Sequence, residues 1–410
     1  MKILVVGAGI TGLAIAENLR REKFAVTLID RIYPGDVRQA SFGNAGMLAK
    51  SGIVPVSSPG FLSKIPRMLM DRDSPLFIRW SYLPKIIPWL VPFLRAGSRK
   101  NIGHLISALD SLTNDTVEQH QTLAAGSEAT KYIKHGNFGF LYPNERAFYQ
   151  DKFSQDAKQD RGYNFQRLDR SAILDLDPNI SQKYNLAAIF SDHAWISSPE
   201  NYTKAIFEYF LKHGGEFLKD EVLHLKPGGL ILKSGQVIHA DKIVIAAGAW
   251  SERLIRKTGL KAKLESESGY HLLFEGPTIM PPFPWMITDG KFIMTPMDNG
   301  LRCAGVVEFA GLDSSPSKAP SELIFRRVNQ VYKNFGFSKQ RTWMGHRPST
   351  PDSLPLIGPI KGRPDIIMAS GSQHLGLTIG AKIGLLVTNI ITKKSVNLDL
   401  SPFDANRFSS

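Results

Sequence analysis

The first thirty residues constrain the fold more than any other stretch of this chain. Residues 3–6 form a continuous apolar run rich in β-branched side chains, which favours a strand buried on both faces. The glycine-rich segment 7–12 follows at once, and residues 13–21 then carry apolar and polar positions at helical spacing. A second apolar run, 24–29, ends in Asp30. We therefore predict a strand, a glycine turn, a helix and a second strand in succession.

Each glycine of the 7–12 segment has its own task in such a unit. Gly7 permits a tight turn off the strand, and Gly12 allows the helix to pack closely on the sheet. Gly9 lets a pyrophosphate approach the helix N-terminus, where free N–H groups and the helix dipole favour an anion. Asp30 lies 18 residues beyond Gly12, where a carboxylate accepts hydrogen bonds from a ribose and disfavours the 2′-phosphate of NADP.

The unit therefore predicts a dinucleotide site, and by itself it does not separate FAD from NAD. A glycine turn without a ligand is one alternative. A secretory signal is another, since Met1 and Lys2 precede an apolar run, but it leaves the glycine spacing unexplained.

Length and composition narrow the class of protein. With 410 residues, 43% hydrophobic and 21% charged, the chain is long enough for two or three domains and too apolar to be disordered. The single cysteine, Cys303, excludes a disulfide framework and a cysteine-cluster metal site, and we predict no metal. A lone thiol fits a reducing compartment, so we expect a cytoplasmic protein. The net charge of +13 suits a membrane surface, nucleic acid or acidic small molecules.

Residues 61–100 mix aromatic and apolar side chains with many lysines and arginines. No run there reaches the roughly 18 uncharged apolar residues that a membrane-spanning helix needs, and Pro84, Pro88 and Pro92 are expected to interrupt helical structure. The mixture suits a peripheral contact with the inner face of the cytoplasmic membrane. A proline-broken pair of short helices packed on the protein's own core is the more frequent outcome for such a stretch.

The remaining segments alternate in type along the chain. Helical spacing is found in 103–134, 202–213 and 382–391. Residues 342–385 are punctuated by glycine and proline, with no helix before residue 382. Strand-like runs are found in 138–142, 216–218, 221–225, 230–232, 237–238, 242–250, 270–274, 291–295 and 301–306.

Four segments together resemble the FAD-dependent D-amino-acid oxidase superfamily, and within it the bacterial D-amino-acid dehydrogenase type, including D-hydroxyproline dehydrogenase-like members. The resemblance runs nearly end to end. One departure lies at Gly371-Ser372-Gln373, where the family often has Gly-His-Gly. The matching segments are 7–12 with Asp30, Ser-Phe-Gly-Asn-Ala-Gly at 41–46, 245–251, and 345–358 followed by 371–378.

The resemblance implies an α/β plus α+β fold. A Rossmann-like FAD-binding domain would carry an inserted mixed-sheet substrate domain, in a glutathione-reductase-type architecture with two dinucleotide folds. The FAD-binding domain would comprise residues 1–55, 196–258 and 342–410. The substrate domain would comprise residues 56–195 and 259–341.

The resemblance also implies which residues hold FAD. In related monomeric sarcosine oxidases a cysteine near the position of Gly345 carries a covalent flavin link. The only cysteine here is Cys303, so noncovalent FAD is expected. The implied cofactor residues are Gly7, Gly9, Ile10, Thr11, Gly12, Asp30, Arg31, Ser41, Asn44, Ala45, Gly46, Val222, Ala247, Gly248, Trp250, Gly371, Gln373, Leu375, Gly376, Leu377 and Thr378.

Oxidation of an amine beside a carboxylate requires a group that fixes the carboxylate. A planar guanidinium binds both oxygens at once, and Arg347 matches the arginine that does so in D-amino-acid and glycine oxidases. Tyr270 is a second candidate for the same carboxylate. His346 and His374 flank the C-terminal motifs and are candidates for a place near the flavin. Each candidate has a structural alternative. Arg347 could instead bind loop carbonyls, Tyr270 could be an ordinary core residue, and the two histidines could be hydrogen-bonded structural groups. His271, Glu265 and Glu267 are weaker candidates.

These residues lead to the function we expect. The chain would oxidise a D-amino acid, or a cyclic D-imino acid of the D-proline or hydroxyproline type, to the imine and pass electrons to a quinone or respiratory acceptor. A glycine- or sarcosine-type oxidase that uses O₂ is the alternative among enzymes. An RNA-modifying flavin domain is a third interpretation. We expect no nucleic acid partner, because the positive charge is dispersed along the sequence.

Overall fold

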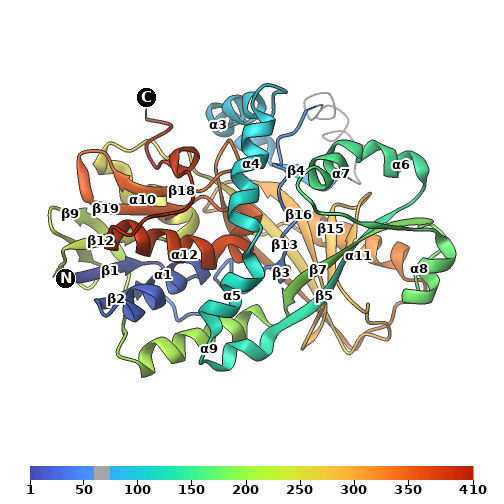
Figure 1. Cartoon of the computed structure of the whole chain (residues 1–410), viewed down its shortest axis with the longest axis horizontal. Coiled ribbons are helices and arrows are strands. Elements are labelled where there is room, and N and C mark those ends of the chain that lie inside the picture. Colours follow the sequence, from blue (N-terminus) through green and yellow to red (C-terminus); the bar gives the residue numbers. More distant parts are fainter. Residues whose placement is uncertain (60–73, 410) are drawn as a thin grey trace.

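The computed structural model describes residues 1–59 and 74–409, and two sheets form its two halves (Figure 1). The first sheet, on the left of the figure, has six strands in the order β18-β19-β12-β1-β2-β8. Neighbouring strands are parallel except for β18, which is antiparallel to β19. The strands are β1 (Lys2–Val6), β2 (Ala25–Asp30), β8 (Glu216–Lys219), β12 (Lys242–Ile245), β18 (Leu356–Ile360) and β19 (Arg363–Ser370).

Both faces of this sheet are covered, which explains the continuous apolar run of β1. Ile3 and Val5 face the helices α1 (Ile10–Arg21) and α12 (Gly376–Thr392). Leu4 and Val6 face the opposite way, toward a three-stranded sheet. Its strands, in the order β11-β10-β9, are β9 (Val222–Lys226), β10 (Gly229–Leu232) and β11 (Val237–His239).

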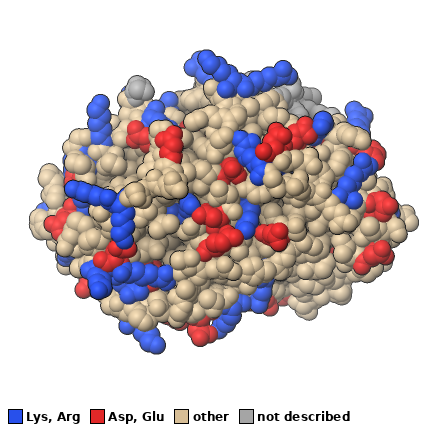
Figure 2. All heavy atoms as spheres, viewed as in Figure 1, with Lys and Arg blue, Asp and Glu red and all other residues tan. Residues whose placement is uncertain are grey.

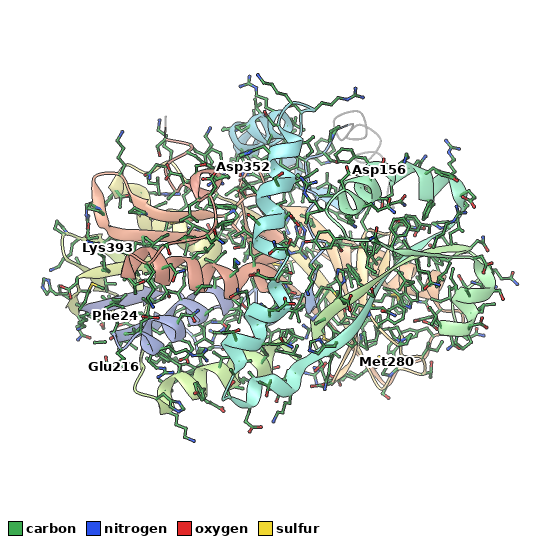
Figure 3. All side chains as sticks on the ribbon, in the orientation of Figure 1. Phe24, Asp156, Glu216, Met280, Asp352 and Lys393 are labelled. Carbon is green, nitrogen blue, oxygen red and sulfur yellow. The ribbon has the colours of Figure 1, made fainter. Side chains whose placement is uncertain are left out.

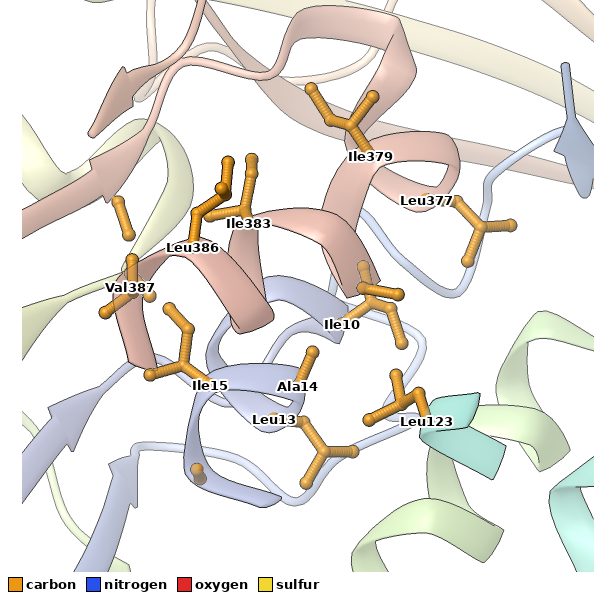
Figure 4. Packing of buried hydrophobic residues seen from close by; sticks show 14 of the residues in the cluster. Ile10, Leu13, Ala14, Ile15, Leu123, Leu377, Ile379, Ile383, Leu386 and Val387 are labelled. Atoms are coloured by element: carbon orange, nitrogen blue, oxygen red, sulfur yellow. The ribbon is translucent and has the colours of Figure 1, made fainter. Parts of the chain in front are cut away.

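Helices α1 and α12 pack directly on each other (Figure 4). Gly384 makes the close approach possible, because a Cβ there would lie 2.8 Å from the Cβ of Ala14. Ile10, Leu13 and Ile383 fill the contact around them. The helices α4 (Ile102–Thr113), α5 (Thr116–Ala124) and α9 (Pro199–Lys212) extend this layer.

The second sheet is mixed and has ten strands. Its main order is β17-β13-β16-β15-β14-β5-β7-β3, with β4 paired to β16 and β6 to β7. Its aromatic core includes Trp285, Tyr332 and Phe274. The strands are β3 (Met47–Leu48), β4 (Leu76–Ile78), β5 (Ile133–Tyr142), β6 (Gln166–Leu168), β7 (Leu186–Ile196), β13 (Glu265–Glu275), β14 (Trp285–Ile287), β15 (Phe292–Met297), β16 (Gly300–Phe309) and β17 (Lys339–Ser349).

The remaining helices lie around this second sheet or at the edge of the first. They are α3 (Leu83–Ala96), α6 (Glu145–Gln150), α7 (Lys152–Gln159), α8 (Arg170–Leu176), α10 (Ser251–Ile255) and α11 (Ala319–Val331). The N-terminal strand, helix and strand of the sequence analysis are confirmed, as is the general fold class. The helix predicted for residues 382–391 is shorter than the observed one, because α12 already begins at Gly376. Strand β17 and helix α11 were not predicted.

The expectation that prolines interrupt residues 83–96 is wrong. Helix α3 is continuous through Pro88 and Pro92, with Pro84 in its first turn. The three prolines repeat every fourth residue and so lie on one face, and Pro84 and Pro88 are exposed. Water can therefore reach the carbonyls that lose their helical partners. The expected segment 61–100 falls partly on residues 60–73, which lie outside the described residues.

One further expectation concerns the residue at which the two predicted domains divide. The division at residue 342 remains a prediction, and β17 runs across it as a strand of the ten-stranded sheet.

Among the described residues one helical stretch, Gln373–Thr392, has the length and hydropathy of a membrane span. Two thirds of it, 67%, is buried inside the protein, as expected for the core helix that packs on α1.

Candidate active site

A cavity of about 1000 Å³ is lined by residues of both sheets. At one end it meets the carboxyl ends of β1, β2 and β12, where parallel sheets usually bind nucleotides. At the other end it is lined by β5, β14 and β15 of the ten-stranded sheet and by α7. All of the implied cofactor residues line it except Gly12, Gly46 and Gly371.

The glycines at the nucleotide end are required by space and by backbone conformation. Gly7 has a φ of +105°, and a Cβ there would lie 2.4 Å from the carbonyl oxygen of Ala246. A Cβ on Gly12 would lie 1.8 Å from the carbonyl oxygen of Gly7. Gly9 is the N-cap of α1 and leaves the first turn open to the cavity, while Ser41 Oγ accepts a 2.9 Å bond from Ile10 N–H. This end therefore offers bare backbone N–H groups to an anion.

Asp30 sits where a ribose would lie in such a unit. Its carboxylate accepts hydrogen bonds from the backbone N–H groups of Ala8 (2.7 Å) and Ile32 (3.2 Å). Burial raises the pKa of Asp30, and the two N–H groups oppose that rise. The Arg31 guanidinium lies 4.3 Å from the centre of the Trp250 ring. Together with Val222, these groups line a pocket in which the Asp30 carboxylate is a hydrogen-bond acceptor and the Arg31 guanidinium and the Trp250 ring provide planar surfaces.

The loop 41–46, which leads from β2 to β3, is held by side chains of the ten-stranded sheet. Its Gly46 has a φ of +82°. Each of its carbonyl oxygens from residue 42 to residue 45 accepts a hydrogen bond from a side chain of β13, β15 or β16. The bonds are Arg302 Nη1 to Phe42 (2.9 Å) and Asn44 (2.8 Å), His271 Nδ1 to Gly43 (3.0 Å) and Thr295 Oγ1 to Ala45 (2.8 Å).

The beginning of α12 forms another wall of the cavity. Its N-cap, Leu375, makes no side-chain cap, and the first turn holds no acidic residue. Gln373 adopts a φ of +48° and donates from Nε2 to the Thr350 carbonyl at 2.9 Å, and Thr378 Oγ1 donates to the Met47 carbonyl at 2.9 Å. Gly371, with a φ of +92°, turns the chain into this segment. The turn thus presents helix N–H groups that favour negative charge nearby.

Arg347 lines the cavity from β17, directly opposite Glu267 on β13. No hydrogen bond or ion pair joins its guanidinium to another described residue. Gly269 makes room for it, because a Cβ there would lie 2.4 Å from Arg347 Nε. Burial lowers the pKa of Arg347, and Glu267 opposes this. The guanidinium stays charged and has donors to spare for a ligand.

Both candidate histidines also line the cavity. His374 faces the cavity, and the surrounding protein together with the nearby Arg347 charge lowers its pKa to about 4. His346 Nδ1 lies 2.8 Å from Ser266 Oγ, and its ring meets the Trp250 ring edge-on at 5.5 Å. Burial lowers the pKa of His346 as well, against the opposing charge of Asp313. Both rings are therefore neutral near pH 7.

Tyr270 is placed elsewhere, so the expectation that it caps a carboxylate is not supported. It is 1% exposed and packs in the core of the ten-stranded sheet. Its hydroxyl donates to Glu308 and accepts the Ser317 N–H at 3.0 Å. Strand alternation is the reason, because Tyr270 points away from the face that carries Gly269 and His271.

Comparison with known proteins identifies the family. Residues 2–390 match the DAO family, described as FAD dependent oxidoreductase. The chain belongs to this family of FAD-dependent oxidoreductases.

Relatives of this FAD-dependent oxidoreductase cover its whole length. It is 32% identical over 416 residues to a D-amino-acid oxidase of Bradyrhizobium diazoefficiens, covering 99% of this chain and 98% of the relative. Its fold is similar to glycine oxidase from Geobacillus kaustophilus (TM-score 0.74, 19% identity, 99% and 98% covered). It is also similar to L-proline dehydrogenase from P. horikoshii (TM-score 0.71, 18% identity, 99% and 97% covered).

The cavity of this FAD-dependent oxidoreductase fits its cofactor. The space that a Cβ would fill at Gly7 and Gly12, the open first turn of α1 and the acceptor Asp30 suit a dinucleotide. The residue-by-residue roles remain predictions.

Sequence reasoning missed the groups that line the rest of the cavity. The clamp residues Arg302 and Thr295 gave no local signal, because their partners are more than 200 residues away in the chain. Lys158 of α7 was also missed. The side chains of α3 that close one side are Leu83, Ile86, Trp89, Leu90 and Phe93, and Trp89 Nε1 donates to the Ser349 carbonyl at 3.1 Å.

Proposed function

We propose that the protein oxidises a D-amino acid, or a cyclic D-imino acid of the D-proline or hydroxyproline type, to the imine and passes the electrons to a quinone or respiratory acceptor. The observation that carries the proposal is the guanidinium of Arg347 on the cavity wall, which no hydrogen bond or ion pair joins to any of the described residues. The likeness to a curated D-amino-acid oxidase supports the same substrate class.

Arg347 would bind the substrate carboxylate through two parallel N–H···O bonds. Fixing the carboxylate fixes the orientation of the neighbouring C–H bond, and such positioning contributes several kcal/mol to catalysis. FAD, when bound, supplies the acceptor for the hydride. Gly269 keeps the guanidinium in place, since any side chain there would displace it.

The amine of the substrate must be neutral when the hydride leaves. His374 and His346 are neutral because burial lowers the pKa of each. Neither therefore repels an ammonium on arrival, and each is able to accept a hydrogen bond from it. No acid or base residue is required if the substrate binds already deprotonated.

Noncovalent binding of FAD is part of the proposal. Cys303 is fully buried in β16 and is absent from the residues that line the cavity. Burial raises its pKa, which keeps the thiol protonated and unreactive.

We also propose that α3 and the residues before it make a peripheral membrane contact. The outer side of this segment exposes Trp80 (67%), Ile87 (48%) and Val91 (42%). Basic side chains gather along the same upper edge of the molecule (Figure 2). Among the described residues, Lys85 and Arg95 of α3 and Arg99 and Lys100 just after it are exposed and basic. Apolar side chains next to cations suit an anionic lipid surface, where a quinone acceptor would be available.

The contact is tested by sedimentation with anionic lipid vesicles. Exchanging Trp80 and Ile87 for glutamate should release the protein from vesicles at physiological salt, because it removes apolar area and adds repulsion. The same exchange at Tyr149 and Phe153, which are exposed on α6 and α7, is the control. Equal sedimentation of both double variants and the parent protein would disprove the contact.

The reaction is tested by titrating the purified protein without oxygen. D-Alanine, D-proline and cis-4-hydroxy-D-proline are added in turn, followed by their L-isomers, glycine and sarcosine. Loss of the oxidised flavin band with D-compounds alone supports the proposal. Bleaching only by glycine or sarcosine would point instead to the amine oxidase alternative, and no bleaching by any of them would refute amine oxidation as stated. Reoxidation by a quinone faster than by air distinguishes the acceptor.

A further inference from the structure

A lysine lines the part of the cavity that is formed by α7 and strand β5 of the ten-stranded sheet. Lys158 lies on α7, is 6% exposed and lines the cavity. Its ammonium lies 4.1 Å from the centre of the Phe140 ring and 4.9 Å from that of Phe190. No hydrogen bond or ion pair joins the ammonium to a residue in the described part of the chain. A nearly buried cation without an anionic partner is unfavourable, and two aromatic faces compensate only in part.

The charged groups around Lys158 leave it without a counterion. The Asp151 carboxylate accepts the Tyr142 hydroxyl at 2.8 Å and lies beyond ion-pair distance of the ammonium. Lys291 lines the same cavity and adds a second positive charge. His193 is held between Ser51 and Ser191, and burial lowers its pKa to about 4, so it is neutral. This corner of the cavity is therefore positive.

We propose that Lys158 is a specificity residue that receives an anionic group at the end of a long substrate side chain. The inference rests on the proposed function, because it assumes that the carboxylate beside the amine is held by Arg347. It names the class of substrate more closely: D-amino acids whose side chains end in a carboxylate or a similar anion.

The sheet between the two cations has the character that such a side chain needs. Arg347 lies on β17, whereas Lys158 lies over β5, five strands along the sheet. The strands between them line the cavity with Glu267, directly opposite Arg347, and then with the apolar Ala304, Ile293 and Met286. A side chain that reaches from Arg347 to Lys158 must cross these strands, so it must be long and its middle apolar.

The pyrophosphate of the cofactor is the other anion expected in the cavity, and it is not the partner of Lys158. The pyrophosphate of the cofactor belongs at the first turn of α1, which lies at the carboxyl ends of β1 and β2. Strands β1 and β2 belong to the six-stranded sheet, whereas Phe140 and Phe190 belong to the ten-stranded sheet. We therefore infer that the partner of Lys158 is an anionic group of the substrate.

Binding to the FAD-loaded protein tests the site without turnover. Suberate and its monomethyl ester share the same eight-carbon chain and differ by one methyl group, but only suberate carries an anion at both ends. Perturbation of the flavin absorbance should show suberate binding about tenfold tighter than the ester, as expected for one charge-assisted contact. In Lys158→Met the preference should disappear, since methionine keeps the volume and removes the charge. In Lys158→Arg it should be retained at least in part.

The matched control lies on the same helix. Lys152 is exposed and forms an ion pair with Asp156, which Figure 3 labels on α7. Lys152→Met removes the same charge from the same helix but not from the cavity, and it should keep the tenfold preference. A preference that survives in Lys158→Met, or that is absent from the parent protein, would overturn the proposal. Thermal melts of each variant establish that it is folded.

Kinetics separate this inference from the proposed function. N6-Succinyl-D-lysine should exceed N6-butanoyl-D-lysine in kcat/KM by about tenfold in the parent protein and by less than twofold in Lys158→Met. If both are oxidised equally well, the anion site is refuted and the proposed function stands. If neither these nor D-alanine is oxidised while suberate is still preferred, the proposed function fails and the anion site remains.

Discussion

The two ends of the cavity are built in opposite ways. The nucleotide end consists of backbone: Gly7, the open first turn of α1 and the N–H groups that hold Asp30. The substrate end consists of side chains such as Arg347 and Lys158, which come from β17 and α7 and are remote in the sequence. Backbone geometry depends on short local motifs, whereas side chains that meet from distant strands depend on the whole topology. The nucleotide end can therefore be recognised from local motifs, whereas at the substrate end Arg347 was expected only through the resemblance and Lys158 required the structure.

The largest effect should come from the glycine that packs α1 on the sheet. Gly12→Val places atoms within 1.8 Å of the Gly7 carbonyl oxygen, a clash that α1 can relieve only by moving. We expect destabilisation of 3 kcal/mol or more, from overpacking combined with the lost turn geometry. The variant should be purified without FAD or not at all.

Gly103 provides the control for this prediction. It lies exposed in α4, and a Cβ there would meet nothing within 4 Å. Gly103→Ala should be neutral or raise stability by about 0.5–1 kcal/mol, because alanine favours a helix. A stable, yellow Gly12→Val protein would show that the nucleotide end does not depend on this close packing.

The next largest effect tests the substrate end. Arg347→Met should lower kcat/KM for carboxylate substrates about 10²-fold or more, since it removes a charge-assisted contact of about 3 kcal/mol. FAD content should stay the same. Arg341→Met on the same strand removes an exposed arginine paired with Glu275, and it should leave kcat/KM within twofold. Equal kinetics for both variants would remove Arg347 from the site.

The pH dependence of anion selection should be smaller. Burial lowers the pKa of Lys158 to about 8, with Asp151 opposing and Lys291 reinforcing the shift. Anion binding needs the ammonium, so the preference for suberate over its ester should be constant below pH 7. It should decline as pH rises above about 8. His193 does not change charge in this range because its pKa is about 4. A preference that grows with pH would contradict the assignment.

The smallest expected effect concerns Tyr270. Tyr270→Phe removes the hydroxyl partner of Glu308 Oε2 and of the Ser317 N–H, although Glu308 Oε1 keeps Arg79, and it should lower the free energy of unfolding by about 1–3 kcal/mol. The KM for a D-amino acid should not change, because the hydroxyl does not reach the cavity. Urea unfolding and steady-state kinetics measure the two quantities. A raised KM with unchanged stability would restore Tyr270 as a carboxylate-binding residue.

Several features were accessible from the sequence. The first strand, helix and strand and the position of Asp30 were predicted because each depends on neighbours in the chain, whereas the 41–46 segment was expected from the resemblance. The placement of Tyr270 could also have been predicted. Tyr270, Leu272 and Phe274 alternate as one apolar face of a strand, which places the tyrosine in the core.

Other features depended on context that a sequence does not carry. Strand β17 was not predicted because it contains Gly345 and Pro348. It tolerates a proline because it is an edge strand of the ten-stranded sheet. The prolines of α3 were tolerated because their carbonyls face solvent. Lys158 gave no signal at all, since a lysine on a short amphipathic helix normally points to water.

The clamp on the 41–46 loop has a consequence for motion. Four hydrogen bonds from Arg302, His271 and Thr295 hold the 41–46 loop, which leads from β2 to β3, against strands of the ten-stranded sheet. Freeing the loop would break all of them at once, at about 0.5–1.5 kcal/mol each and more for the charged arginine. The part of the cavity wall that this loop forms is therefore held rigidly.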